Sequence, residues 1–117
     1  MSTSTNLARS FVRYLIESGV SDFVLSPGSR NAPLSIALNE AAQKGLIELH
    51  IKLDERGAAY FALGISKASD KYVAVICTSG TAVANYLPAA LEAHHANNKL
   101  LLLTADRPAR LRKTGAN

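Results

Sequence analysis

Apolar residues recur along this chain with two different periods, and the longer period predicts four helices. The first covers residues 4–18 and presents one apolar face: Leu7, Ala8, Phe11, Val12 and Leu15. The second begins near Pro33, ends at Gly45 and buries Leu34, Ala37, Leu38 and Ala41. The third is marked by Ala58, Phe61, Ala62 and Ile65. The fourth reaches about Asn97, and Pro88 either kinks it or lies in its first turn.

Short apolar runs between these helices predict four strands, over residues 22–25, 46–53, 72–78 and 99–104. Residues 72–78, YVAVICT, are apolar on both faces, which is typical of a strand covered by helices on both sides. Helix and strand alternate from the start of the chain to residue 104, and the segment that follows has no clear periodicity. This order predicts an α/β fold, a doubly wound and mainly parallel sheet with helices on both faces.

Polar and glycine-rich segments follow each predicted strand. SPGSR follows the first strand, DERG the second, TSGTA the third and TADRP the fourth. Because the carboxyl ends of parallel strands meet at one edge of the sheet, these four segments should lie together, where such folds bind ligands. The sequence therefore predicts a binding site at this edge.

Composition narrows the possible partners. The 117 residues are 48% hydrophobic and 19% charged, which suits one small globular domain. The net charge is +4, and the cations of the segment 107–113 account for all of it. Only 6% of the residues are aromatic, so we expect no nucleic-acid partner. A single cysteine, Cys77, favours a reducing compartment and hence the cytoplasm, and no apolar run is long enough to predict a membrane span.

Two of the four segments carry candidate anion-binding groups. In SPGSR, Gly28 permits close backbone approach, Ser29 offers a hydroxyl, and Arg30 stands at a helix start, where anions bind. Arg107 follows the fourth strand, and a carboxylate substrate would account for Arg30 and Arg107 facing one cleft. The simpler alternative is a turn with solvated arginines.

The other two segments carry candidate chemistry for a flat ligand. Asp54 and Glu55 stand at a helix start, where one acid suffices as a cap, and the small residues after Glu55 leave room for a planar group. In TSGTAVAN, backbone N–H groups and hydroxyls suit a heterocycle or a carboxylate, although a tight turn explains them equally. We expect Cys77 to be a buried, inert thiol and His94 and His95 to be surface residues, and we find no metal-ligand cluster.

Four segments together, SPGSRNAPL, DERGAAYFALG, TSGTAVANYLPA and LTADRPARLRKTGAN, resemble the thiamine-diphosphate-dependent synthase family of menaquinone biosynthesis. The similarity runs in order from the first helix to Asn117. The resemblance implies a thiamine-diphosphate-binding fold, with residues 1–117 as the N-terminal part of its pyrimidine-binding domain. It also implies the family reaction, in which 2-oxoglutarate is decarboxylated and its succinyl unit is added to isochorismate.

The resemblance assigns roles to single residues. Glu55 matches the glutamate that hydrogen-bonds N1′ of the cofactor's aminopyrimidine ring and promotes loss of the C2 proton. The pyrimidine side would be lined by Thr78, Gly80, Thr81 and Asn85. The isochorismate carboxylates would be contacted by Ser29, Arg30 and Arg107.

The resemblance further implies parts that this sequence does not contain. Family members hold diphosphate and Mg²⁺ through a Gly-Asp-Gly…Asn motif in another domain, and that motif does not occur here. We therefore expect a fragment of a longer enzyme, inactive alone, whose full-length form is a homo-oligomer, a dimer or tetramer. Apolar surface along the third and fourth helices would favour self-association. The alternative is a non-catalytic, flavodoxin-like module that binds a small anionic ligand, in which Glu55 is merely a cap.

Overall fold

The sheet is parallel throughout. The computed structural model describes residues 2–115. Four strands, β1 (Asp22–Leu25), β2 (Glu48–Ile51), β3 (Val73–Cys77) and β4 (Leu100–Thr104), pair in the order β2-β1-β3-β4. In the centre of the sheet, Val24 lies between His50 and Val75. All three strand pairs are parallel, which confirms the predicted arrangement.

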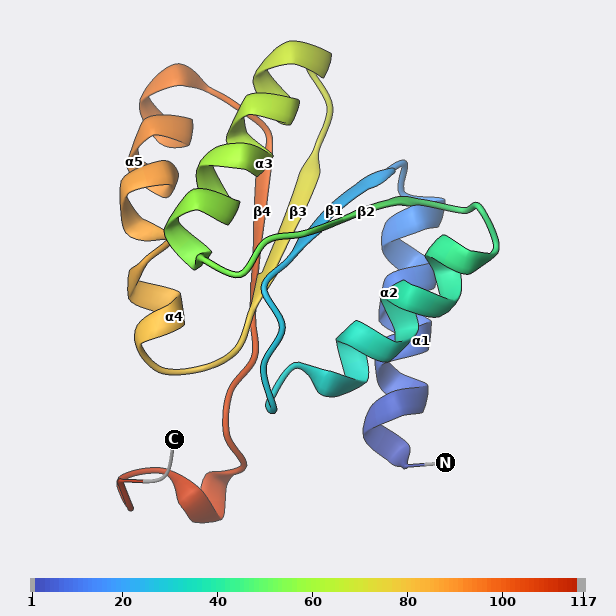
Figure 1. The fold of residues 1–117 in the computed structure, drawn as a ribbon, viewed down its shortest axis with the longest axis vertical. Helices are drawn as coiled ribbons and strands as arrows, with labels where there is room; N and C mark the ends of the chain where they lie inside the picture. Colours follow the sequence, from blue (N-terminus) through green and yellow to red (C-terminus); the bar gives the residue numbers. More distant parts are fainter. Residues whose placement is uncertain (1, 116–117) are drawn as a thin grey trace.

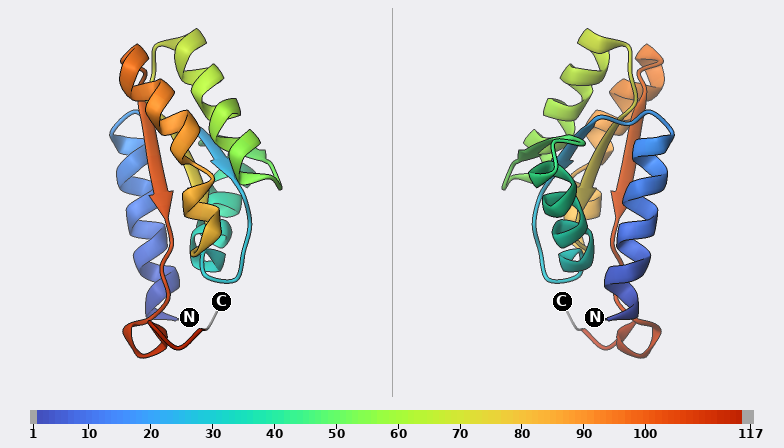
Figure 2. Two further views of the ribbon diagram at one scale, coloured as in Figure 1. Left: turned by 90° about the vertical axis from the view of Figure 1, so that its left-hand side faces the viewer. Right: turned by 90° about the vertical axis from the view of Figure 1, so that its right-hand side faces the viewer.

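Helices cover both faces of the sheet (Figures 1 and 2). One face carries α1 (Thr3–Glu17) and α2 (Ala32–Gln43), and the other carries α3 (Glu55–Ser69), α4 (Thr81–Ala84) and α5 (Leu87–Ala96). After β4 the chain forms a short 3₁₀ helix, η1 (Ala109–Leu111), which the sequence pattern did not predict. The predicted fourth helix is two helices, and Pro88 lies in the first turn of α5, one of the two expected alternatives.

The core consists of two clusters of unequal side-chain size, one on each face. Facing α1 and α2 are Phe23, Leu25, Ala74 and Ile76, which pack with large residues such as Val12, Leu15 and Leu38. Facing α3, α4 and α5 are Val24, Val73, Val75 and Cys77, which pack with small residues and one ring: Ala58, Ala59, Ala62, Ala82, Ala89 and Tyr86. Because the second cluster is mainly alanine on the helix side, α3 lies close against the sheet.

Three large apolar residues on the expected inner faces of the helices are exposed. Leu7 and Phe11 are 71% and 38% exposed, because only Ala8, Val12 and Leu15 of α1 reach the core. Phe61 is 38% exposed, because it packs on the partly covered edge strand β2. Its ring lies edge-on to the His50 ring, and Lys52 Nζ lies 4.2 Å from the centroid of the Phe61 ring.

β2 is shorter than the strand predicted over residues 46–53, since it covers Glu48–Ile51. Leu53 is 80% exposed, because the chain leaves the sheet after Ile51, and Leu46, before the strand, is 55% exposed. The alternation over residues 46–53 therefore overestimates the length of an edge strand.

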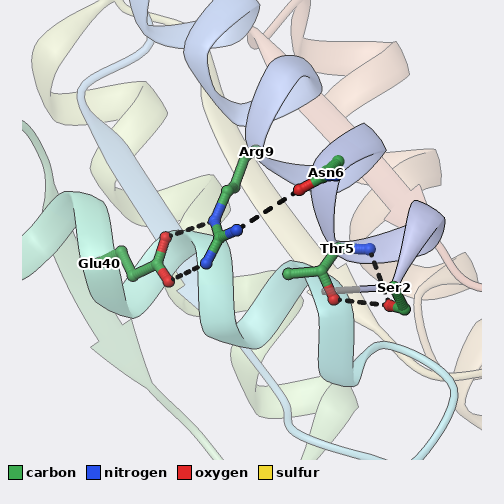
Figure 3. A network of polar contacts seen from close by, with 5 residues as sticks. All are labelled: Ser2, Thr5, Asn6, Arg9 and Glu40. Carbon is green, nitrogen blue, oxygen red and sulfur yellow. Dashed lines mark hydrogen bonds and ion pairs between the residues drawn. The ribbon is translucent and has the colours of Figure 1, made fainter.

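An arginine–carboxylate pair joins α1 to α2 (Figure 3). Arg9 Nε donates to Glu40 Oε2 at 2.7 Å, and Arg9 Nη2 donates to Glu40 Oε1, so the contact is bidentate. Arg9 Nη1 lies 3.5 Å from Asn6 Oδ1. The hydrogen bonds from the Arg9 guanidinium hold the pKa of the Glu40 carboxyl below its usual range.

This pair predicts a pH dependence of stability. Because the pKa of Glu40 is lower in the folded state, its contribution is present at neutral pH and is lost as pH falls through that lowered pKa. Between pH 7 and about 3, the wild type should therefore lose more unfolding free energy than Glu40→Gln, as measured by urea denaturation. Glu17→Gln is the control, because Glu17 lies 3.9 Å from Arg13 in an exposed pair. Equal losses for the wild type and Glu40→Gln would contradict the prediction.

Candidate functional site

The four polar segments lie at the carboxyl ends of the strands, and the loops after β1, β3 and β4 are at the lower end of Figure 1. Hydrogen bonds link them in pairs. Ser26 Oγ donates to the Lys52 carbonyl at 2.7 Å, which joins the segments after β1 and β2. Ala105 N donates to the Cys77 carbonyl at 3.1 Å, which joins the segments after β3 and β4. The predicted common edge is confirmed.

The closest approach between segments is at Gly28, after β1, and Thr78, after β3. A Cβ added at Gly28 would lie 2.6 Å from Thr78 Cβ, so only glycine fits. β1 and β3 are central neighbours, with β2 on one side and β4 on the other. The contact therefore marks the point where the strand order reverses, at which open α/β sheets bind ligands.

Asn31 holds the loop after β1 in place, and the sequence analysis missed it. Its side chain is fully buried. Asn31 Oδ1 accepts from Gly28 N at 2.7 Å, and Nδ2 donates to the Ser26 carbonyl at 2.9 Å. An asparagine just before a helix with proline in its first turn was the available signal, since Asn side chains bond nearby backbone in turns. In this loop Ser29 is exposed, and half-buried Arg30 lines a hollow of about 340 Å³ with Leu7, Phe11 and Leu34 among its walls.

Glu55 is the first residue of α3, and its neighbour supplies the helix cap. Gly57 N donates to Asp54 Oδ2 at 2.7 Å, which confirms the capping role expected of Asp54. Glu55 is half-buried and forms no hydrogen bond or ion pair with any residue that the structure describes. It precedes Ala58, Ala59 and Ala62 by three, four and seven positions, so it shares their buried helix face. The carboxylate therefore stands at the edge of the sheet without a partner in this part of the chain.

The Glu55 carboxylate contributes to the raised pKa of two buried groups, Cys77 and Tyr86. Burial raises the pKa of the Cys77 thiol, the adjacent Tyr86 hydroxyl lowers it by less, and the Glu55 carboxylate adds a smaller rise. The net rise fits the expected inert thiol. Burial also raises the pKa of Tyr86 far above its usual range, with smaller contributions from Cys77 and Glu55. Both groups are therefore protonated at neutral pH.

The segment after β3 turns sharply into α4. Gly80 is the N-cap, with φ +76° and ψ −137°, a conformation suited to glycine. Thr81 is exposed at the start of α4, and Thr78 is half-buried against Gly28. Asn85 Nδ2 donates to the Thr81 carbonyl at 3.0 Å, so this amide is turned toward its own helix. The structure brings Thr78 and Gly80 to the common edge with Gly28 and Arg107.

Arg107 reaches from the segment after β4 to the segment after β3. Its Nη2 donates to Ser79 Oγ at 3.3 Å and lies 3.7 Å from the position of a Cβ added at Gly80. Arg107 Nε is buried and has no hydrogen-bond partner within residues 2–115. Arg112 instead pairs with Asp106 at 2.9 Å. Arg30 and Arg107 thus have different neighbours, and the single cleft between them stays a prediction.

No group of three or more His, Cys, Asp and Glu side chains among residues 2–115 is arranged to hold a metal ion. His94 and His95 are exposed on α5, as expected, with their ring centroids 5.4 Å apart. None of the helices in the described range combines the length and apolar character that crossing a bilayer requires.

Comparison with known proteins gives a consistent result. Residues 5–117 match the family described as thiamine pyrophosphate enzyme, N-terminal TPP binding domain. The 2-succinyl-5-enolpyruvyl-6-hydroxy-3-cyclohexene-1-carboxylate synthase of Nocardioides sp. (strain ATCC BAA-499 / JS614) is 56% identical over 98% of the chain. Proteins of the same name from Saccharopolyspora erythraea and Mycobacterium leprae (strain Br4923) are each 52% identical over the whole chain. The chain spans about a fifth of the length of these relatives, 21% in each case.

The contact between Gly28 and Thr78 predicts a site-specific rescue. Gly28→Ala should lower the unfolding free energy by about 1–3 kcal/mol, because the added methyl group overlaps the Thr78 side chain. Gly28→Ala combined with Thr78→Gly should recover part of this loss, because the overlapping atoms are removed. Gly64→Ala, where a Cβ meets open space, is the control. Denaturant unfolding measures these three variants together with the wild type and the single variant Thr78→Gly, and strictly additive losses would rule out the proposed overlap.

Proposed function

The chain belongs to the thiamine pyrophosphate enzyme family, as the N-terminal TPP-binding domain, and on this premise we propose its part in a reaction. It is the pyrimidine-binding part of a carboligase that decarboxylates 2-oxoglutarate and adds the succinyl unit to isochorismate in menaquinone biosynthesis. The name shared by the relatives supports this substrate pair, since it describes a 2-succinyl cyclohexene carboxylate. The observation that carries the proposal is the Glu55 carboxylate at the carboxyl edge of the sheet, which has no partner among residues 2–115.

Glu55 holds a proton in shared contact with N1′ of the aminopyrimidine ring. The bound cofactor supplies a carbon nucleophile at its thiazolium C2 when its pyrimidine ring is activated in this way. The site fits such a ring, because Glu55 shares a helix face with the small residues Ala58 and Ala59. No other described residue forms a hydrogen bond or an ion pair with the Glu55 carboxylate oxygens. In the alternative, a non-catalytic binding module, Glu55 serves as a helix cap, but Asp54 already supplies that cap.

The segments after β1 and β3 provide the remaining cofactor contacts. Thr78, Gly80, Thr81 and Asn85 line the pyrimidine side, with Gly80 allowing close approach of the ring to backbone. Support comes from the position of Thr78 and Gly80 at the reversal of strand order. The diphosphate and its Mg²⁺ ion are held by another domain of the complete enzyme, since the described part of this chain has no metal-ligand cluster.

Ser29, Arg30 and Arg107 bind the carboxylates of isochorismate. Arginine suits this role because its planar guanidinium grips a carboxylate through two parallel hydrogen bonds. Arg107 supports the assignment with a buried Nε that has no partner in residues 2–115. A buried donor of this kind normally finds an acceptor, and a substrate carboxylate supplies one.

The complete enzyme works as a homo-oligomer in the cytoplasm, and the 117-residue chain alone is inactive. The helices α3, α4 and α5 support an assembly, because each of them exposes large apolar side chains: Tyr60, Phe61, Val83, Leu87 and Leu91. Contact along these helices places a second domain or subunit beside Glu55 and excludes water from the site.

Glu55→Gln tests the central role. In the complete enzyme, kcat should fall at least about 100-fold, because glutamine cannot hold or release the proton, while the fold is kept. Isothermal calorimetry with thiamine diphosphate and Mg²⁺ checks that the variant still binds cofactor. Glu92→Gln, an exposed change on α5, is the matched control. A variant with near wild-type kcat would refute the assignment.

Arg107→Lys tests the substrate contact. The lysine keeps the charge but loses the two-pronged geometry, so KM for isochorismate should rise about tenfold while KM for 2-oxoglutarate changes little. Steady-state kinetics with each substrate varied in turn measures the difference. Arg110→Lys, on the exposed η1 turn, is the control. A parallel rise in both KM values would show that Arg107 acts on the fold instead of on one substrate.

A further inference from the structure

Tyr86 lies at the break between α4 and α5, and its hydroxyl forms no hydrogen bond with any residue that the structure describes. The residue is 2% exposed and belongs to the buried cluster that also contains Ala58, Ala59, Ala62 and Cys77. Its hydroxyl oxygen is buried and has no hydrogen-bond partner in the described part of the chain. The adjacent Cys77 sulfur interacts with the hydroxyl and helps to raise the pKa of Tyr86. Sulfur is a weak acceptor, however, and this contact does not meet hydrogen-bond geometry. Buried tyrosine hydroxyls usually find a partner, so this one calls for an explanation.

Glu55 is a candidate acceptor, because it extends from the helix that supplies three alanines to the Tyr86 cluster. Glu55 lies on the same face of α3 as Ala58, Ala59 and Ala62, which belong to the buried cluster that contains Tyr86. Its charge raises the pKa of both Tyr86 and Cys77, so the carboxylate lies within electrostatic reach of both. Like the phenol, it has no hydrogen-bond or ion-pair partner within residues 2–115.

The two groups complement each other in chemistry and in mobility. A protonated phenol donates one hydrogen bond, and an ionised carboxylate only accepts. The Tyr86 ring is fixed by packing on all sides, whereas the half-buried Glu55 side chain is free to change rotamer. A hydrogen bond to a charged group is also stronger than one between neutral groups.

We propose that Tyr86 is a positioning residue that donates a hydrogen bond to the Glu55 carboxylate when that side chain turns toward the sheet. The bond holds the carboxylate in one orientation at the mouth of the buried alanine cluster. Its consequence for catalysis rests on the proposed function, in which Glu55 shares a proton with the cofactor. The hydrogen bond itself does not depend on that function.

The first test uses NMR on the 117-residue chain without cofactor. In wild-type protein, the Tyr86 hydroxyl proton should exchange slowly and show a nuclear Overhauser effect to the Glu55 side chain. In Tyr86→Phe, which keeps the ring, the ¹³C resonance of the Glu55 carboxyl should move at neutral pH. It should stay unchanged in Tyr72→Phe, because Tyr72 is 53% exposed and outside the cluster.

Cys77→Ala separates the two possible partners of the phenol. It should leave the Overhauser effect to Glu55 in place, because the thiol is not the acceptor. The proposal is overturned if Tyr86→Phe leaves the Glu55 resonance where it was. It is also overturned if the wild-type hydroxyl proton shows a contact to the Cys77 side chain and none to Glu55.

The second test measures the catalytic consequence in the complete enzyme. Tyr86→Phe should lower kcat about tenfold, the size of one hydrogen bond to a charged group, with KM for both substrates within about twofold. Tyr72→Phe should have no effect on either constant.

If Glu55→Gln proves fully active while the NMR contact is present, the proposed function fails and the hydrogen bond stands. If Glu55→Gln is inactive and Tyr86→Phe leaves the Glu55 resonance unmoved, only the role of Tyr86 fails.

Discussion

The parallel pairing of β1 with β3 is the constraint on which the site depends. These two strands fill the centre of the sheet, and their paired residues, such as Phe23 with Ala74 and Leu25 with Ile76, are almost fully buried. Because they run in the same direction, Gly28 and Thr78 leave the sheet side by side, close enough that no side chain fits between them. An antiparallel pair would have sent these two loops to opposite ends of the domain.

Polar groups inside the loops secure this arrangement, so that the site does not rely on apolar packing alone. The buried Asn31 side chain satisfies both a donor and an acceptor in the loop after β1, and Ser26 ties that loop to the end of β2. Asp54 takes over the capping of α3 and leaves Glu55 uncommitted. A buried amide with both ends bonded is rigid, because any movement leaves a polar atom without a partner.

The sequence predicted the strands and the common edge well, because buried strands are short, apolar and bounded by turn residues. It failed where exposure depends on neighbours far along the chain. Periodicity groups Leu7 and Phe11 with the inner face of α1, but the width of the contact with α2 and the sheet decides that both remain exposed. Tyr86 was beyond sequence reasoning for a related reason. The break between α4 and α5 resets the helical period, so no pattern across residues 81–96 indicates which aromatic side chain enters the core.

The unequal composition of the two core clusters has a consequence for how this domain tolerates change over evolutionary time. On the side of α1 and α2, leucine, valine and phenylalanine can be exchanged for one another with local repacking. On the side of α3, alanines set the height of the helix above the sheet, and Glu55 stands on that helix. One added methyl group there would lift a whole helix and carry the carboxylate with it. Amino-acid substitutions should therefore accumulate in the cluster facing α1 and α2. The cluster facing α3, α4 and α5 should change little, because the position of Glu55 depends on it.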